Sequence, residues 1–214
     1  MFDTIFGDPQ IHSDSFLSRY AIVTGQVVIA EGVMVAPGAV LRADEESPFH
    51  ICKGVNIQDL AVLHGLFGQF VEVNGKKYSI YIDSHCSVSH CVIIHGPTYV
   101  GKKSFIGFRS TVHDSKIGRN CFVGTHAVIQ DSTVAEYCHV GIEAKIIGVV
   151  VERERYIPDG MMVNTQEIAD ALPMISREQA EKDRAFNKHV VDMNKMKLRK
   201  LYNERRRLRE NKIF

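Results

Sequence analysis

The stretch from residue 82 to residue 112, IDSHCSVSHCVIIHGPTYVGKKSFIGFRSTV, carries an aliphatic residue at every sixth position. These positions are Ile82, Val88, Ile94, Val100, Ile106 and Val112. Neither an α-helix nor a β-hairpin has a period of six, whereas a parallel β-helix of hexapeptide repeats does, with three hexads in each triangular coil. The stretch therefore predicts a mainly β protein built as a left-handed parallel β-helix.

The same spacing extends to both sides of this stretch. It starts at Val23, breaks between Leu41 and Ile51, and later continues, with two one-residue slips, to Ile146. We expect residues 1–20 to form an irregular lead-in and residues 149–175 to form a connector that contains a short helix. Residues 65–79 interrupt the spacing, and their Asn-Gly pair between alternating residues predicts a small hairpin that protrudes from a coil corner.

The C-terminal part of the chain has a different pattern. Ser176 followed by Gln179 is typical of a capping box, and a long helix is predicted from about residue 177 to about residue 210. We therefore expect two domains, with the β-helix in residues 1–175 and a helix packed on it in residues 176–214.

The predicted helix carries an apolar stripe with one polar interruption. The stripe consists of Phe186, Val190, Leu198, Leu201 and Leu208. Asn194 lies within it, so its carboxamide is either a hydrogen-bonded structural amide or a site residue that the helix brings to the prism.

Composition excludes several classes of protein. The 214 residues are 45% hydrophobic with a formal net charge of +1, which indicates neither a nucleic-acid partner nor a membrane partner. The basic run in the helix is read as a solvated helix face rather than an RNA site. The N-terminal segment has no signal-peptide pattern, which predicts a cytoplasmic protein. Cys86, Cys121 and Cys138 occupy small inward positions, which favours packing over disulfides or metal ligation.

The same periodicity predicts the orientation of three histidine side chains. His64 and His95 come directly after the inward residues Leu63 and Ile94, so both side chains should face outward. His90 lies two residues after Val88 and should also face outward. An outward histidine on one prism cannot complete a coordination sphere alone, so a second prism must lie beside it.

Several polar motifs recur along the chain in a fixed order. They are Arg42-Ala43-Asp44-Glu45, Asn56-Ile57-Gln58-Asp59, Val62-Leu63-His64-Gly65, the segment from Ser87 to Pro97 that contains His90 and His95, the segment from Arg155 to Val163, and Val190-Val191-Asp192-Met193-Asn194. Together they resemble the γ-class carbonic anhydrases over roughly residues 21–200. The segment from Phe105 to Val112 is similar to the carboxysome-associated branch of that family.

This resemblance implies a homotrimer with a metal site at each subunit interface. His64 and His95 would come from one subunit and His90 from its neighbour. Three imidazoles and an open position are typical of catalytic Zn²⁺, although such a site also accepts Fe²⁺ or Co²⁺. The implied reaction is the reversible hydration of CO₂ to bicarbonate.

The resemblance also implies roles for the neighbouring polar residues. Gln58 would orient the nucleophile, Glu45 would hydrogen-bond it or the product, and Asn194 would border the CO₂ pocket. Arg42, Asp44 and Asp59 match positions that form ion pairs between subunits. The remaining histidines match no ligand position and are predicted to be surface or interface residues: His12, His50, His85, His113, His126, His139 and His189.

One position departs from the family pattern. The prototype has a glutamate that carries protons three residues after its first ligand histidine, and this chain has Phe67 there. Activity is therefore expected to be low or to depend on buffer. Two alternatives remain open, namely a hexapeptide-repeat acyltransferase or thioesterase-like enzyme, and a weakly active or inactive scaffold that the metal stabilises.

Overall fold

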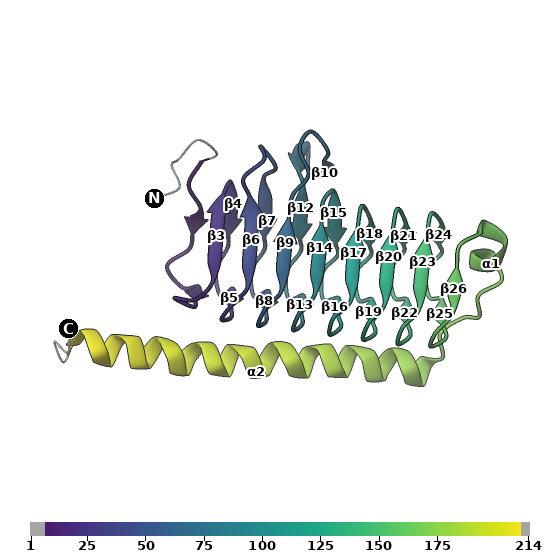
Figure 1. The fold of residues 1–214 in the computed structure, drawn as a ribbon. Helices are drawn as coiled ribbons and strands as arrows, with labels where there is room; N and C mark the ends of the chain where they lie inside the picture. The colour runs from purple at the N-terminus through teal and green to yellow at the C-terminus, as the bar shows by residue number, and fades with distance from the viewer. Residues whose placement is uncertain (1–6, 211–214) are drawn as a thin grey trace.

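The computed structural model describes residues 7–210 as a triangular prism of short parallel strands with a long helix along one face (Figure 1). Each of the three faces is an eight-stranded sheet in which neighbouring strands belong to successive coils and run parallel. The predicted fold class, a mainly β parallel β-helix with a C-terminal α-helix, is confirmed.

The three faces are named here by what they carry. The first face contains β1 (Gln10–Ile11), β4 (Val27–Ile29), β7 (Phe49–Ile51), β12 (Ile80–Ile82), β15 (Thr98–Val100), β18 (Lys116–Ile117), β21 (Thr133–Val134) and β24 (Val150–Val151). The helix face contains β2 (Phe16–Leu17), β5 (Met34–Val35), β8 (Asn56–Ile57), β13 (Ser87–Val88), β16 (Phe105–Ile106), β19 (Phe122–Val123), β22 (His139–Val140) and β25 (Tyr156–Ile157). The histidine face contains β3 (Ile22–Gly25), β6 (Val40–Ala43), β9 (Val62–His64), β14 (Ile93–His95), β17 (Thr111–His113), β20 (Val128–Gln130), β23 (Lys145–Ile147) and β26 (Met162–Val163).

The inward aliphatic residues form the core. Leu63, Ile94 and Val112 are fully buried and lie opposite one another on adjacent strands, so that each side chain stacks on its equivalent in the next coil. Fully burying one such side chain contributes about 1.5–3 kcal/mol. The cysteines at the small inward positions are buried and free, as the sequence predicts, and burial raises the pKa of the Cys86 thiol.

The prism is longer than the hexad spacing predicts. Residues 1–20 are not simply a lead-in, because β1 and β2 already pair with β4 and β5. At the other end Val151, Ile157 and Val163 are fully buried and extend the core beyond Ile146. The first coil has a neighbour on only one side, and it therefore lacks the regular aliphatic pattern. In the last coil a run of charged residues, Glu152 to Arg155, separates the buried Val151 and Ile157, which obscures the period.

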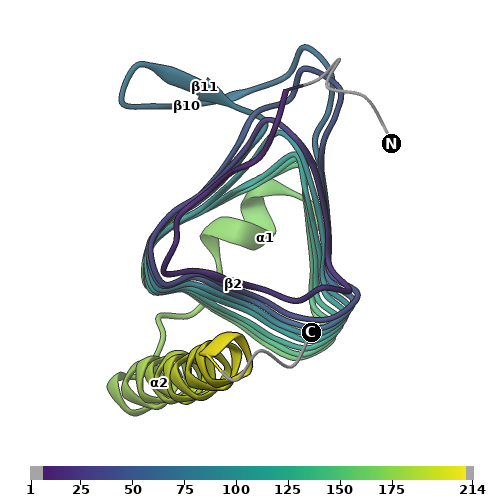
Figure 2. The same cartoon turned by 90° about the vertical axis from the view of Figure 1, so that its left-hand side faces the viewer.

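The predicted insertion forms a hairpin at one apex of the triangle (Figure 2). Its strands are β10 (Val71–Val73) and β11 (Lys76–Tyr78), which pair antiparallel. Asn74 and Gly75 join them with positive φ angles of 51° and 72°, as a two-residue hairpin turn requires.

Two helices follow the prism. The short helix α1 (Gln166–Asp170) packs against β24 and β26 at the end of the last coil. The long helix α2 (Arg177–Glu210) begins with the backbone N–H of Gln179 donating to Ser176 Oγ over 3.1 Å, as the capping pattern predicts. From there α2 runs back along the helix face to the first coils (Figure 1). Neither helix in residues 7–210 contains a stretch long and apolar enough to cross a bilayer.

The side of α2 that faces the sheet differs from the predicted stripe. The buried residues are Asp183, Asn187, Val191 and Asn194, whereas Phe186 is 42% exposed. The helix face presents polar partners, and this explains why polar side chains are buried there. The side chains of Leu198, Leu201 and Leu208 lie outside the described part of the structure.

Candidate metal centre

His64 and His95 lie side by side at the corner where the histidine face meets the first face, called here the His95 corner. They end the adjacent strands β9 and β14 and are in register. Because Leu63 and Ile94 point into the core, both imidazoles point outward, as predicted. His64 Nδ1 lies 3.3 Å from His95 Nε2.

This separation suits two ligands on one ion. His95 Nδ1 is 3.1 Å from the carbonyl oxygen of Gly96, and an N–H there donates to that oxygen and leaves Nε2 with a lone pair. Two nitrogens bound to a tetrahedral zinc at about 2.0–2.1 Å are about 3.3–3.4 Å apart. The two imidazoles therefore fit a single Zn²⁺ as a pair.

Carboxylates make this corner attractive to a cation. His64 Nε2 lies 3.4 Å from Glu45 Oε1 and 4.0 Å from Asp44 Oδ1, and this nitrogen is buried without a hydrogen-bond partner among the described residues. A bare lone pair facing two carboxylate oxygens is unfavourable, whereas an N–H at Nε2 removes the repulsion and leaves the lone pair of His64 Nδ1 for the ion. Asp44 also forms an ion pair with Arg42 of the same chain at 3.0 Å.

His90 lies at the next corner, called here the His90 corner, where the helix face meets the histidine face. Its Nδ1 is 3.0 Å from Asp59 Oδ2, and its ring stacks on Phe108 with a centroid distance of 5.5 Å and an interplanar angle of 7°. A carboxylate that accepts from one imidazole nitrogen orients the other as a metal ligand. The sequence analysis did not predict this contact between Asp59 and His90. The two residues are 31 positions apart, as are the paired residues Ile57 and Val88 on adjacent strands.

Four of the predicted site residues gather at the His90 corner. Gln58, Asp59, His90 and Asn194, together with Met34, line part of a groove of about 260 Å³ between this corner and α2. Gln58 Nε2 donates to Asn56 Oδ1 over 3.0 Å, which fixes its carboxamide. Asn194 Nδ2 donates to the carbonyl oxygen of Val190 in its own helix over 2.9 Å.

The two corners are far apart within one chain. An extended chain advances about 3.3 Å per residue, so the five-residue step from His90 to His95 spans on the order of 15 Å. In the described residues 7–210, no group of three or more His, Cys, Asp or Glu side chains is placed to hold a metal ion. One chain therefore carries two incomplete parts of the predicted site, one at each end of the histidine face.

Three other residues that the sequence analysis singled out can be located. Phe67 is 64% exposed at the start of the insertion, close in sequence to His64. His113 is one strand beyond His95, with ring centroids 5.0 Å apart. His139 is not a surface residue, because it is 8% exposed and its Nδ1 contacts Asp183 Oδ2 of α2 at 2.8 Å. The hexad spacing predicts that this side chain points outward, but nothing in the sequence indicates that α2 covers it.

Comparisons with known proteins agree with this architecture. A family model described as GlmU-like, C-terminal hexapeptide matches residues 98–179. A solved structure of a proposed acetyltransferase from Bacillus cereus covers 89% of this chain and 91% of its own, with a TM-score of 0.57 and 21% sequence identity. At that identity the likeness shows the fold alone.

Two relatives are closer in sequence. The carboxysome assembly protein CcmM of Nostoc sp. is 40% identical over 188 residues, 87% of this chain and 30% of that protein, so the chain spans less than a third of it. The carbonic anhydrase of Methanosarcina thermophila is 36% identical over 182 residues, 80% of this chain and 67% of that enzyme. Because this similarity extends over most of both sequences, the chain belongs to the γ-class carbonic anhydrase family.

Proposed function

We propose that the chain forms a homotrimer that reversibly hydrates CO₂ to bicarbonate at three zinc sites. Each site would take His64 and His95 from one subunit and His90 from the next. The observation that carries this proposal is the 3.3 Å imidazole pair at one end of the histidine face, with the third histidine oriented by Asp59 at the other end. Proteins of this family are typically trimers, which would bring unlike corners of neighbouring prisms together.

The residues around the proposed site would divide the chemistry. Zinc held by three neutral imidazoles supplies hydroxide near neutral pH when it is bound. Gln58, whose carboxamide is fixed by Asn56, would hydrogen-bond the attacking oxygen and orient it. Met34 and Val190 give the groove an apolar wall for CO₂, and Asn194 lines the same groove.

Proton export is the weak part of the proposed reaction. Hydration releases one proton per turnover, and Phe67 at the position of the family's proton carrier cannot accept it. Glu45, whose carboxylate lies 3.4 Å from His64, is the nearest acidic side chain that could take its place. We therefore expect turnover to depend on a small buffer molecule.

Subunit complementation tests the proposal. A His90→Ala chain keeps the imidazole pair, whereas a His64→Ala/His95→Ala chain keeps His90. Neither variant alone should bind zinc firmly. After unfolding and refolding as an equal mixture, about a quarter of the interfaces should combine the intact parts and recover both zinc and CO₂ hydration.

The controls separate assembly from chemistry. Each variant refolded alone should stay empty of zinc, and light scattering should show whether it is still a trimer. Zinc bound at full occupancy by the His90→Ala chain alone would contradict the shared site. Recovery of zinc without hydration would retain the shared site and reject the enzyme.

That last result would favour a second candidate function, a weakly active or inactive assembly scaffold stabilised by metal. Phe67 at the proton-carrier position favours this candidate, as does similarity to a protein named for carboxysome assembly. Removal of the metal should then dissociate the trimer whether or not hydration is measurable. The acyl-transfer alternative rests on fold similarity alone, and the cytoplasmic location remains a prediction.

A further inference from the structure

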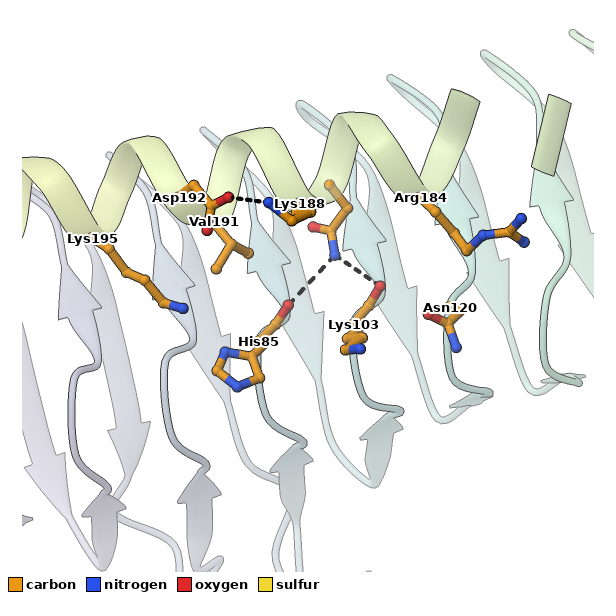
Figure 3. Close-up of a pocket in the computed structure, with 9 residues that line it drawn as sticks. His85, Lys103, Asn120, Arg184, Lys188, Val191, Asp192 and Lys195 are labelled. Atoms are coloured by element: carbon orange, nitrogen blue, oxygen red, sulfur yellow. Dashed lines mark hydrogen bonds and ion pairs between the residues drawn. The ribbon is translucent and has the colours of Figure 1, made fainter. Parts of the chain in front are cut away.

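A second groove lies on the other side of α2, away from the proposed metal centre. It has a volume of about 350 Å³ and runs between α2 and the corner where the first face meets the helix face (Figure 3). His85, Lys103 and Asn120 occupy that corner in three successive coils, each with a φ of 54° to 60°. The positive φ repeats because every coil turns at this point, and the repetition lines up the three residues beneath the helix.

The groove has more cations than carboxylates. Within the described part of the chain Lys103, Arg184 and Lys195 have no ion-pair partner, whereas Lys188 contacts Asp192 at 2.7 Å. Burial and the nearby charges of Lys195, Lys102 and Lys103 lower the pKa of His85, so its imidazole is mainly neutral at pH 7. An anion in the groove would reduce the repulsion among these cations.

The cations lie along a line. Arg184 and Lys195 are eleven residues apart on one helix, which corresponds to about 16 Å along its axis. Lys103 approaches from the sheet side between them (Figure 3). A single phosphate can therefore contact one end of this row but not both, which leaves the rest of the groove for another part of the ligand.

The groove wall also contains an unfilled acceptor. Asn187 is only 5% exposed, and its Nδ2 donates to the carbonyl oxygens of Lys103 and His85 over 2.8 Å and 3.4 Å. Asn187 Oδ1 has no hydrogen-bond donor in the described structure. Because Oδ1 is itself closed to solvent, a ligand reaches this oxygen only when the carboxamide turns toward the groove, and it must then bring a hydroxyl or N–H group.

We propose that this groove binds a small phosphorylated polyol, such as a sugar phosphate. The phosphate would contact Lys103 and Arg184, and the hydroxyl groups would face the carboxamides of Asn187 and Asn120. The volume lies within the usual range of small-molecule sites, about 300–1,000 Å³. The proposed site shares no residue with the metal centre, so it does not depend on the proposed carbonic anhydrase activity.

Calorimetry on the full chain with three probes tests the proposed ligand class. Ribose 5-phosphate should bind saturably, inorganic phosphate should bind at least tenfold more weakly, and ribose should not bind measurably. Equal affinity for inorganic phosphate would overturn the hydroxyl part of the proposal. Absence of saturable ribose 5-phosphate binding up to about 10 mM would overturn all of it.

Matched charge variants test the location. Arg184→Gln and Lys103→Gln should each weaken ribose 5-phosphate binding at least tenfold. Lys182→Gln is the control, because it removes the same charge from the same helix but lines a different groove beside Phe122. An equal loss with Lys182→Gln would mean that only the overall charge of the helix attracts the ligand, and it would reject the site. Circular dichroism of each variant checks that α2 remains folded.

Discussion

The two ends of the histidine face carry the same kind of side chain in different surroundings. At the His95 corner, two imidazoles lie 3.3 Å apart against the carboxylates of Glu45 and Asp44. At the His90 corner, one imidazole is held by Asp59 and stacked on Phe108. The first corner concentrates negative charge and paired nitrogens, whereas the second fixes the direction of a single nitrogen. Metal affinity should therefore depend more strongly on the first corner than on the fixing groups of the second.

Loss of an imidazole from the pair should have the largest effect. We expect His95→Ala to lower zinc affinity by at least about 100-fold, because it removes a ligand and leaves His64 facing two carboxylates alone. Metal content after dialysis, measured by mass spectrometry, checks this. His113→Ala is the matched control, since His113 follows in register on the next strand and should leave zinc occupancy unchanged.

Loss of the fixing carboxylate should have a smaller effect. We expect Asp59→Asn to weaken zinc binding about 10- to 100-fold, because His90 remains but loses the partner that orients it. Competition with a chelator gives the affinity. The control is Glu143→Gln, because it removes a carboxylate that lies 3.9 Å from His126, a histidine outside the proposed zinc site. If Asp59→Asn binds zinc as the unmodified chain does, the distinction between the two corners fails.

The groove beside the His90 corner should affect turnover rather than metal binding. We expect Asn194→Ala to lower CO₂ hydration per bound zinc by roughly tenfold in stopped-flow measurements, as loss of one positioned polar group does. Asn187→Ala is the control on the same helix, and it should destabilise the protein by about 1–3 kcal/mol through unpaired backbone carbonyls. Unchanged hydration per zinc with a lower melting temperature would make Asn194 a structural amide.

Changes that affect only proton export should have the smallest effect. Measuring them would sharpen the comparison at the His95 corner. We expect turnover to rise severalfold with the concentration of an imidazole-type buffer, because Phe67 cannot carry the proton. Phe67→Glu should then raise turnover more at low buffer than at high buffer. High turnover that is indifferent to buffer would show that another group already exports the proton.

Much of the fold and part of the site could be predicted because a parallel β-helix is periodic. The hexad spacing fixed which side chains point inward, and it placed His64 and His95 on the outside next to buried residues. The Asn-Gly pair and the capping residues are local signals, and the hairpin and the start of α2 follow them closely.

The missed features depend on contacts between distant segments. Asp59 reaches His90 because successive coils stack at one corner, and that pairing is visible only once the coil length across the insertion is known. Which side of α2 is buried depends on the hydrogen-bond partners that the sheet presents to it. His139 offers Asp183 a partner, and the carbonyl oxygens of His85 and Lys103 offer one to Asn187, so these polar residues are buried, whereas Phe186 contacts Phe105 and Phe122 and stays partly exposed.

The course of α2 has a consequence for how the protein unfolds. A solenoid in which each coil touches only its neighbours can fray one repeat at a time from its ends. Here α2 starts beneath the last coil and packs on β19, β13 and finally β2 in the first coil, so one continuous element runs the length of the prism (Figure 1). Opening either end therefore strips contacts from the helix as well. The solenoid should behave as one cooperative unit, with amide hydrogens in its first and last coils exchanging with solvent at similar rates.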